Sequence, residues 1–427
     1  MDRGDLQQLS KEELIELVLR LQRPDKTSRT SSKPPSLDRK ERREHARPGG
    51  AKPGHEGHSR KLSESFDRLY DHKPSICPAC GLGFVGEEEG QLISEHDKID
   101  IMPIKPFVER HRRFARCCSG CGTLVEAQLP AAVGGTPFGP NLHALATYFK
   151  TFQAVSYERL QAIFAELFGL TISQGGLMNM LCRAQKAFKA SREQAVARLR
   201  RADVVASDET GVRIEGANSY HWVFRCEEAV VHQASTTRAA SVVREVMGGH
   251  EPQVWLSDRY SAQQGHGGSH QTCLAHLARK VAFALENSDD MVPLRLKLWL
   301  GTVFALARNI KHFAASTIAA KQRDLERQLA DILAVATACD LSREIQAQLR
   351  RAQHQLLTFC AWPGKVEVTN NACERDLRPS VIQRKVTNGY RAMWAAQGEA
   401  DVRTVVDTAR LAPGITAFGT IFSTVRA

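Results

Sequence analysis

The segment from residue 201 to residue 272 constrains the fold more than any other part of the chain. Its apolar runs are rich in β-branched and aromatic side chains, and short polar turns separate them. In order along the chain they are DVVASDETGVRIEG, SYHWVFRCEE and AVVHQAST, then the helical AASVVREVM, then PQVWLSD. The pattern predicts three strands, a helix and a fourth strand. We expect the fourth strand to lie beside the first.

This order of elements is that of the start of an RNase H-like sheet, and two carboxylates lie at strand ends within it. Asp208 ends the apolar run DVVAS, and Asp258 ends the run QVWLS. If the two strands are parallel neighbours, both side chains project at the same sheet edge. An aspartate at a strand end is also a common turn or cap residue, so neither one alone establishes a site.

The motif NNACERDLRP supplies a third carboxylate. Its Glu374 is followed by the cations Arg375, Arg378, Arg384 and Lys385. Two strand-end aspartates and a helical glutamate can hold two Mg²⁺ or Mn²⁺ ions about 3.5–4 Å apart, which activate a water or a 3′-hydroxyl. The cations suit a phosphate backbone beside such ions. The alternative for a single helical glutamate is a solvated surface residue.

Two C-x-x-C-G motifs predict a structural zinc site. Cys77 and Cys80 form the first pair, and Cys118 and Cys121 form the second. Each motif brings two thiolates to one side, and two such turns complete a tetrahedral zinc ribbon without an open position. Cys117 has the wrong spacing to Cys121, and two accidental pairs are the alternative. The chain holds 11 cysteines, an odd number, which favours free or metal-bound thiols over disulfides.

A net charge of +11 predicts a polyanionic partner, with nucleic acid first and an anionic membrane surface second. Residues 24–61 hold 11 Lys or Arg against 5 Asp or Glu, and five Pro. This segment is either a flexible arm that neutralises DNA phosphates or a solvated linker. Arg112 and Arg113 add a basic face to the expected ribbon. The uncharged run 127–149 holds three Pro and three Gly, so we expect no membrane span, and we expect a cytosolic protein.

Residues 137–200 hold three apolar-periodic stretches that predict helices. Gly169 lies where a C-cap glycine belongs, and Ser173 is a candidate N-cap. A helix, a short turn and a helix fit a helix-turn-helix with GGLMNML as its reading helix, although a plain bundle explains the pattern equally. Residues 10–22 predict a further leucine-rich helix, which either pairs with a second copy or docks on its own chain.

Helical periodicity returns at residues 273–365. Cys273 and His276 form a C-x-x-H pair at its start. The segment HGGSH just before it contains His266 and His270, which could bind a metal. We expect instead that this glycine-rich segment is a loop near the active site.

Taken in order, these motifs resemble the insertion sequence 66 family of bacterial DDE transposases. The resemblance covers nearly the whole chain. It rests on SSKPPSLD, PGHEGHSR, the four cysteines, LPAAVGGTPFGPNLHALATYF, SDET, LSDRYSAQ, CLAHLARK, NNACERDLRP and RKVTNGYR. The ordered set is specific, whereas no single motif is.

The resemblance implies a DNA transposase with an RNase H-like catalytic domain. Asp208, Asp258 and Glu374 then form the catalytic trio and the ligands of two Mg²⁺ or Mn²⁺ ions. The 116 positions between Asp258 and Glu374 fit an all-helical insertion. Cys273 and His276 correspond to the C-x-x-H element that related transposases carry, for which we expect a structural or DNA-facing role.

The implied partners are the ends of the element, target DNA, a further copy of the chain and accessory proteins of the same element, in the bacterial cytoplasm at the nucleoid. Two rival interpretations are a zinc-ribbon DNA-binding regulator with a non-catalytic sheet domain, and a nuclease that cleaves without joining. A non-catalytic domain has no need of all three carboxylates, which argues against the regulator.

The expected architecture is a multidomain α/β chain with an RNase H-like catalytic domain split by a helical insertion. The expected segments are a leucine-rich helix at 1–23, a basic arm at 24–71, a zinc ribbon at 72–125, a helix-turn-helix-like region at 126–200, the catalytic domain at 201–272 and 366–427, and the insertion at 273–365.

Overall fold

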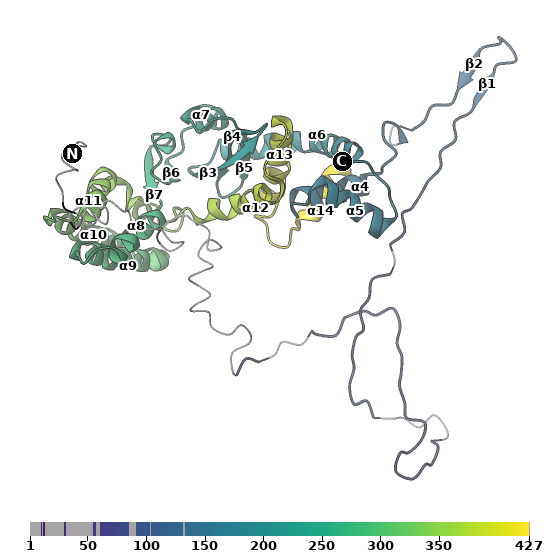
Figure 1. Cartoon of the computed structure of the whole chain (residues 1–427), viewed down its shortest axis with the longest axis horizontal. Helices are drawn as coiled ribbons and strands as arrows, with labels where there is room; N and C mark the ends of the chain where they lie inside the picture. Colours follow the sequence, from purple (N-terminus) through teal and green to yellow (C-terminus); the bar gives the residue numbers. More distant parts are fainter. Residues whose placement is uncertain are drawn as a thin grey trace.

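The computed structural model describes residues 10, 12, 30, 54–56, 60–84, 91–102, 104–130 and 133–426. The leucine-rich helix expected at residues 10–22 and most of the basic arm lie outside the described residues, as does the SSKPPSLD motif. The described part has a mixed α/β body, in which a sheet lies between two groups of helices (Figure 1).

The sheet in the body has the strand order β5-β4-β3-β6-β7. Its strands are β3 (Val204–Ile214), β4 (Ala217–Arg225), β5 (Val230–Ser235), β6 (Val254–Ser257) and β7 (Ser269–Thr272). The first three are antiparallel neighbours, whereas β6 pairs with β3, and β7 with β6, in parallel. The expected position of the fourth strand beside the first is therefore confirmed.

Alternating side chains of the sheet contact two different layers of helices. Trp222 of β4 packs in one cluster with α6 (Gln174–Leu199) and α7 (Ala240–Met247). Its neighbour Val223 packs on the opposite side, in a cluster with α12 (Asn371–Thr387). Successive side chains of a strand point to opposite faces, so the apolar run in β4 is buried on both sides.

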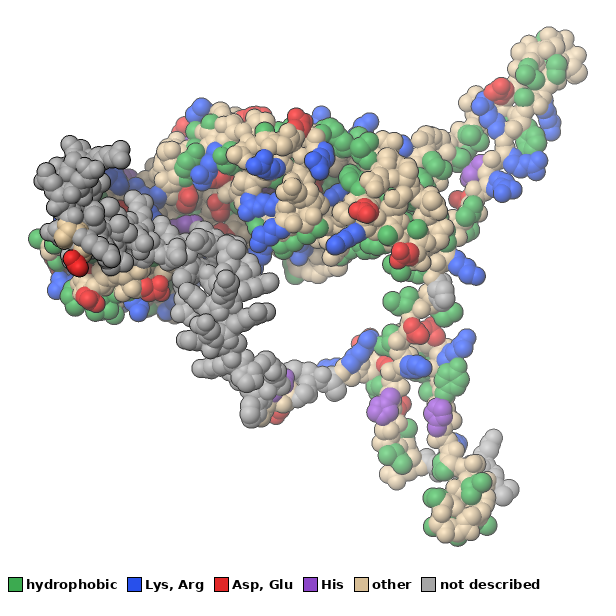
Figure 2. All heavy atoms as spheres, in the orientation of Figure 1, with side chains coloured by type: hydrophobic (Ala, Val, Ile, Leu, Met, Phe, Trp, Pro, Cys, Tyr) green, Lys and Arg blue, Asp and Glu red, His purple; other side chains and the backbone are tan. Residues whose placement is uncertain are grey.

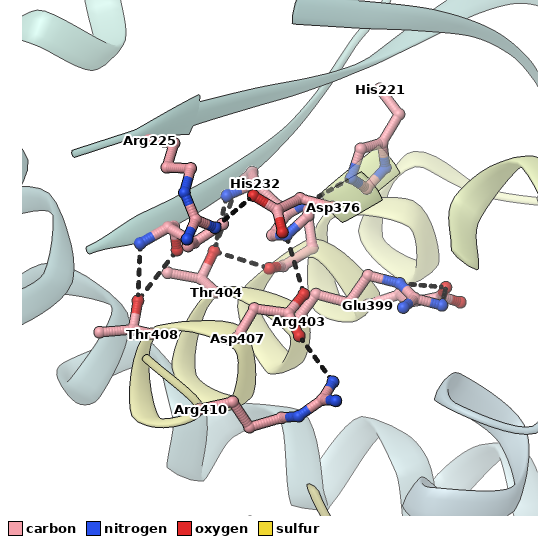
Figure 3. A network of polar contacts seen from close by, with 12 residues as sticks. His221, Arg225, His232, Asp376, Glu399, Arg403, Thr404, Asp407, Thr408 and Arg410 are labelled. Carbon is pink, nitrogen blue, oxygen red and sulfur yellow. Dashed lines mark hydrogen bonds and ion pairs between the residues drawn. The ribbon is translucent and has the colours of Figure 1, made fainter. Parts of the chain in front are cut away.

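A buried polar network holds α13 (Met393–Ala409) on strand β5 (Figure 3). Nδ1 of His232 lies 3.0 Å from Nε2 of His221, and its Nε2 lies 3.1 Å from Oδ2 of Asp407. The backbone N–H of His232 donates to Oγ1 of Thr404 at 2.9 Å. Burial lowers the pKa of His221 well below its usual value, so this ring is neutral at physiological pH. The network gives these buried polar groups partners and fixes the helix on the sheet.

Both helix boundaries expected around residue 170 are found in the structure. Gly169 ends α5 (Tyr157–Phe168) with a left-handed φ of 63°, and Oγ of Ser173 accepts the N–H of Gly176 at 3.1 Å. The following helix α6 is 26 residues long. It packs against α4 (Pro140–Thr151) and α5 at one end and against the sheet at the other, so this one helix connects the first helical group to the sheet.

The C-terminal helix returns to the first helical group. α14 (Ala417–Arg426) packs on α4 (Pro140–Thr151), with the ring of Phe418 edge-on to Tyr148 at 5.5 Å between centroids. Figure 1 shows α4, α5 and α14 together at one end of the body. The two ends of the described body are therefore joined in one apolar cluster.

A second group of helices lies between β7 and α12 in the order of the chain, as the periodicity predicts. Its helices are α8 (Leu274–Glu286), α9 (Met291–Asn309), α10 (Ala315–Ala334) and α11 (Asp340–Ala352), with 3-10 turns at Ile310–His312, Gln353–Gln355 and Thr358–Ala361. They enclose an apolar core around Trp299, whose indole N–H donates to the carbonyl of Leu325 at 2.9 Å.

The HGGSH segment is part loop and part strand: His266, Gly267 and Gly268 precede strand β7, which begins at Ser269. Gly268 donates to the carbonyl of Pro252 at 3.0 Å, and β7 then continues beside β6. A Cβ on Gly267 would lie 2.8 Å from the same carbonyl, so this backbone can approach only as glycine. Nε2 of His266 faces the carbonyl of Ala262 at 2.8 Å, within hydrogen-bond distance. The glycines therefore indicate close packing of two backbones.

Candidate active site

Asp208 and Asp258 lie at the same level on neighbouring parallel strands. In the pairing of β3 with β6, Val204 is opposite Val254 and Ala206 is opposite Leu256, an offset of 50 positions. The same offset leads from Asp208 to Asp258, the first residue after β6. The structure therefore brings both aspartates to one edge of the parallel pair.

Asp208 does not end its strand, contrary to the sequence-based expectation. β3 continues to Ile214, because its antiparallel pairing with β4 extends beyond Asp208. The parallel partner β6 ends at Ser257, and this leaves the level of Asp208 without a further strand on that side. The end of β6, rather than the end of β3, therefore defines the edge of the sheet at which Asp208 and Asp258 lie.

Glu374 lies in the first turn of α12, and a buried asparagine holds that turn on the sheet. Nδ2 of Asn370 donates to the carbonyl of Ser207 at 2.8 Å, and the backbone N–H of Asn370 donates to Sγ of Cys273 at 3.1 Å. Asn370 is 1% exposed. The residue just before the helix is therefore bonded to the residue just before Asp208, and sequence analysis did not single it out.

The three carboxylates interact electrostatically. Burial, followed by the neighbouring charges of Glu209 and Asp258 and by that of Glu374, raises the pKa of Asp208 well above its usual value. Glu374 is paired with a cation: Nη2 of Arg279 lies 3.2 Å from its Oε1, and Nε2 of His276 lies 3.9 Å from the same atom. Both partners belong to α8 of the helical insertion.

No group of three or more His, Cys, Asp or Glu side chains within the described residues is placed to hold a metal ion. The contacts of Glu374 give the physical reason at the trio: its carboxylate is turned toward Arg279. Three carboxylates repel one another unless a cation lies among them. The donor atoms are all oxygens, the type that Mg²⁺ and Mn²⁺ take.

A fourth acidic residue beside the trio was not anticipated. Glu209 follows Asp208 in β3, and its side chain is 2% exposed. Its carboxylate accepts hydrogen bonds from Arg238 at 2.7 Å and from Gln263 at 2.5 Å. The only sequence signal was the adjacency of two acidic residues in SDET, because both partners are remote in sequence.

The cations after Glu374 have two different environments. Arg375, Arg378 and Lys385 are exposed on α12. Arg384 instead donates to Oγ1 of Thr210 at 2.9 Å and to the carbonyl of Gly211, so it joins the helix to β3. Figure 2 shows further Lys and Arg side chains over the middle of the body. Three of the four cations that follow Glu374 are thus exposed to solvent, whereas the fourth, Arg384, is hydrogen-bonded within the fold.

The two residues of the C-x-x-H pair have different surroundings: Cys273 is packed in the interior, and His276 lies beside Glu374. Cys273 is fully buried and accepts the N–H of Asn370. His276 is half-buried beside Glu374, and burial lowers the pKa of its ring, as does the charge of Arg279. The cysteine is therefore a structural residue, whereas the histidine lies beside the carboxylates.

The two cysteine pairs form matching turns that do not meet. Gly81 donates to the carbonyl of Cys77 at 2.9 Å, and Gly122 donates to that of Cys118 at 2.8 Å. Both glycines have a left-handed φ, of 73° and 72°. Cys80 and Cys121 are exposed, and the four thiols are not gathered into one group. The turns have the expected knuckle form, but the structure does not assemble the expected ribbon.

The second turn lies on a hairpin that projects from the body (Figure 1). Its strands are β1 (Ala115–Cys117) and β2 (Leu124–Glu126). Arg113 pairs with Glu126 across the hairpin, whereas the guanidinium of Arg112 lies over the ring of Phe114 at 5.1 Å. Arg112 and Arg113 are both exposed.

A mixed α/β fold with two aligned aspartates and a neighbouring glutamate is consistent with the catalytic domain of a DDE transposase. The chain belongs to the transposase IS66 family, whose family model matches residues 135–398. The expected family is therefore confirmed. The matched region contains Asp208, Asp258 and Glu374 and begins after the last of the ribbon cysteines.

No match to the chain was found among curated proteins. None of the helices in the described part of the chain combines the length and the apolar character needed to cross a membrane.

Proposed function

We propose that this transposase cleaves and joins DNA strands with Asp208, Asp258 and Glu374, on an RNase H-like catalytic domain. The observation that carries the proposal is the aligned register of Asp208 and Asp258, with α12 bonded to the sheet beside them. The strand order, with the fourth strand parallel to the first and helices on both faces, supports the RNase H-like assignment.

The three carboxylates would hold two Mg²⁺ or Mn²⁺ ions. When bound, such ions activate an attacking hydroxyl or water and stabilise the leaving oxygen of a phosphodiester. Asp208 and Asp258 would supply oxygens from the sheet edge, and Glu374 would supply oxygens from α12 if its side chain turned away from Arg279. Burial and its acidic neighbours raise the pKa of Asp208, so binding of a metal ion at this carboxylate would weaken as the pH falls.

The cationic side chains would hold the DNA backbone next to this site. Arg375 and Arg378 are exposed one turn apart on the helix that carries Glu374, so they can contact phosphates beside the scissile bond. Arg112 and Arg113 on the projecting hairpin, the helix pair α5 and α6, and the basic arm would grip the ends of the element. Joining of two ends requires at least two copies of the chain, with accessory proteins of the element as further partners, in the bacterial cytoplasm.

The four ribbon cysteines would hold one structural Zn²⁺. Their turns present thiolates in the form that zinc knuckles have, and a hydrogen bond with its neighbour Cys80 is the main cause that lowers the pKa of Cys77. The segment has large exposed apolar side chains, including Phe107 and Ile101. Closing the two knuckles on a metal would let this segment bury some of that surface.

The strand-transfer experiment uses the full chain, Mg²⁺ and DNA that carries the ends of the element. Wild-type protein should give joined products, and Asp208→Asn, Asp258→Asn and Glu374→Gln should each lose them by at least about 100-fold, since each removes a metal oxygen. Asp401→Asn is the matched control, a half-buried carboxylate on α13 paired with Arg192 at 2.8 Å, and it should still join DNA.

The products distinguish the rival functions. Cleaved ends without joined products would favour a nuclease. Sequence-specific binding of DNA ends without any cleavage by the wild-type chain would favour a regulator. Joining at the wild-type rate by Asp208→Asn would exclude the proposed trio.

Zinc is tested separately by metal analysis. About one zinc per chain is expected for the wild type, since four thiolates complete one tetrahedral site. The double variant Cys77→Ser/Cys118→Ser should lose it, whereas Cys226→Ser, a buried cysteine of the sheet domain, should keep it. Equal zinc content in all three proteins would contradict the ribbon.

A further inference from the structure

The loop after β6 carries Asp258, and it is held from the far side of the sheet. The backbone N–H of Tyr260 donates to Oδ1 of Asp258 at 2.8 Å, and Nε2 of Gln264 donates to the carbonyl of Asp258 at 3.1 Å. The short 3-10 turn η3 (Ser261–Gln263) lies between these two residues. The direction of the Asp258 carboxylate therefore depends on where residues 258–264 are placed.

Glu209 anchors this loop at two points. Its Oε2 accepts the side-chain N–H of Gln263 at 2.5 Å, and its Oε1 accepts Nε–H of Arg238 at 2.7 Å. Arg238 in turn lies 3.7 Å above the ring of Tyr260, and its carbonyl accepts the hydroxyl of Tyr260 at 3.2 Å. Glu209 thus fixes both the residue that binds Asp258 and the turn that follows it.

The position of Glu209 separates it from the metal-binding trio. Asp208 and Glu209 are adjacent in β3, so their side chains point to opposite faces of the sheet. Asp208 lies on the side of Ala206, which packs with α12, whereas Gln263 donates to Glu209 and also receives the indole N–H of Trp255 on the other face. Both oxygens of Glu209 are already bonded, so its arrangement suits an anchor rather than a fourth ligand.

We propose that Glu209, acting through Arg238 and Tyr260, is a positioning residue that aims Asp258 at the shared metal site. The proposal rests on the proposed function, because only a reaction at Asp258 makes the aim of that carboxylate matter. A buried carboxylate is costly unless it is fully paired, and the two anchored partners give it that pairing. Loss of the Glu209 carboxylate would therefore loosen the loop that carries Asp258, without removing a metal ligand.

The test compares variants of the full chain by Mn²⁺ affinity, single-turnover strand transfer, DNA affinity and thermal stability. Glu209→Gln and Tyr260→Ala should weaken Mn²⁺ binding and slow the reaction by roughly 10- to 100-fold, as is usual when a support of a metal ligand is removed. DNA affinity should stay within about twofold, because phosphate contacts are untouched. Tyr260→Phe keeps the ring under Arg238 and should stay close to wild type.

Asp401→Asn is the matched control, because it breaks another largely buried ion pair between an arginine and a carboxylate, away from the loop. If Glu209→Gln and Tyr260→Ala lower only the thermal stability, as this control does, the ion pair is merely structural and the proposal is wrong. If Glu209→Gln loses an ion while Tyr260→Ala binds normally, Glu209 is itself a ligand, which also overturns it. If Asp258→Asn changes neither Mn²⁺ binding nor joining, the proposed function fails instead.

Discussion

The backbone N–H of Asn370 donates to Sγ of Cys273 at 3.1 Å, across 97 positions of the chain. This contact joins the beginning of α8 to the beginning of α12, so both ends of the helical insertion meet at one buried point. The side chain of Asn370 also bonds the carbonyl of Ser207, next to Asp208. The insertion therefore leaves and re-enters the sheet domain beside the three carboxylates.

Asn370→Ala should lower both stability and activity. It leaves the buried carbonyl of Ser207 without its partner, which costs about 1–3 kcal/mol in the free energy of unfolding. It also frees the first turn of α12, so strand transfer per folded molecule should fall. Denaturant unfolding and single-turnover assays measure the two effects. Cys360→Ala, a buried change within the insertion core, should affect stability alone; equal activity losses in both variants would contradict this role.

Asp208→Asn should stabilise the metal-free protein while it abolishes joining. Burial and acidic neighbours raise the folded-state pKa of Asp208, so the folded state binds a proton that the unfolded chain releases. Stability from this group is complete below the unfolded pKa and is lost as pH rises through the folded pKa. At neutral pH the variant should therefore be more stable than the wild type, because its amide carries no charge into the buried site. Thermal unfolding from pH 4 to 8 checks this, and an unchanged pH slope would contradict it.

Arg279→Gln should increase the affinity for Mn²⁺. The guanidinium of Arg279 lies 3.2 Å from Glu374 and competes with a metal for the same oxygen. Without it, Mn²⁺ should bind several-fold more tightly, on the order of 1 kcal/mol. Arg279→Lys retains the charge and is the control. Weaker Mn²⁺ binding by Arg279→Gln would show that the arginine orients Glu374 for the metal.

Stability should decline on acidification because of His270. Burial is the main cause that lowers the pKa of this ring from 6.5 to about 4. The unfolded chain then binds a proton that the folded state does not, so the stabilising contribution is present above pH 6.5 and is lost as pH falls toward about 4. His270→Gln should flatten this part of the pH–stability profile. A wild-type profile without a decline between these pH values would contradict the prediction.

Arg375→Gln and Arg378→Gln should weaken DNA binding uniformly across sequences. Each exposed cation that neutralises a phosphate contributes close to one unit to the salt slope, so each variant should reduce that slope by about 0.9. Fluorescence anisotropy over a range of salt concentrations measures it. Arg323→Gln, an exposed cation on α10, is the control. An unchanged slope for both α12 variants would place the DNA elsewhere.

Local patterns in the amino-acid sequence determine much of this protein. The two-residue alternation of strands and the helical periodicity predict the order of elements, and Gly169 and Ser173 mark helix boundaries where the structure has them. The motifs also indicate the family and name Asp208, Asp258 and Glu374. These signals are readable because each depends on neighbours within a few residues.

The tertiary structure alone decided how these residues meet. The offset that aligns Asp208 with Asp258, the pairing of Glu374 with Arg279 across 95 positions, and the anchoring of Arg384 on β3 all depend on packing between distant segments. The glycines of HGGSH predict a flexible turn, and only the tertiary structure shows that they pass close to the backbone of Pro252 just before strand β7 begins. The sequence by itself thus names the chemical groups of the site, while the contacts of the folded chain set which of them touch, because burial and pairing are properties of the whole fold.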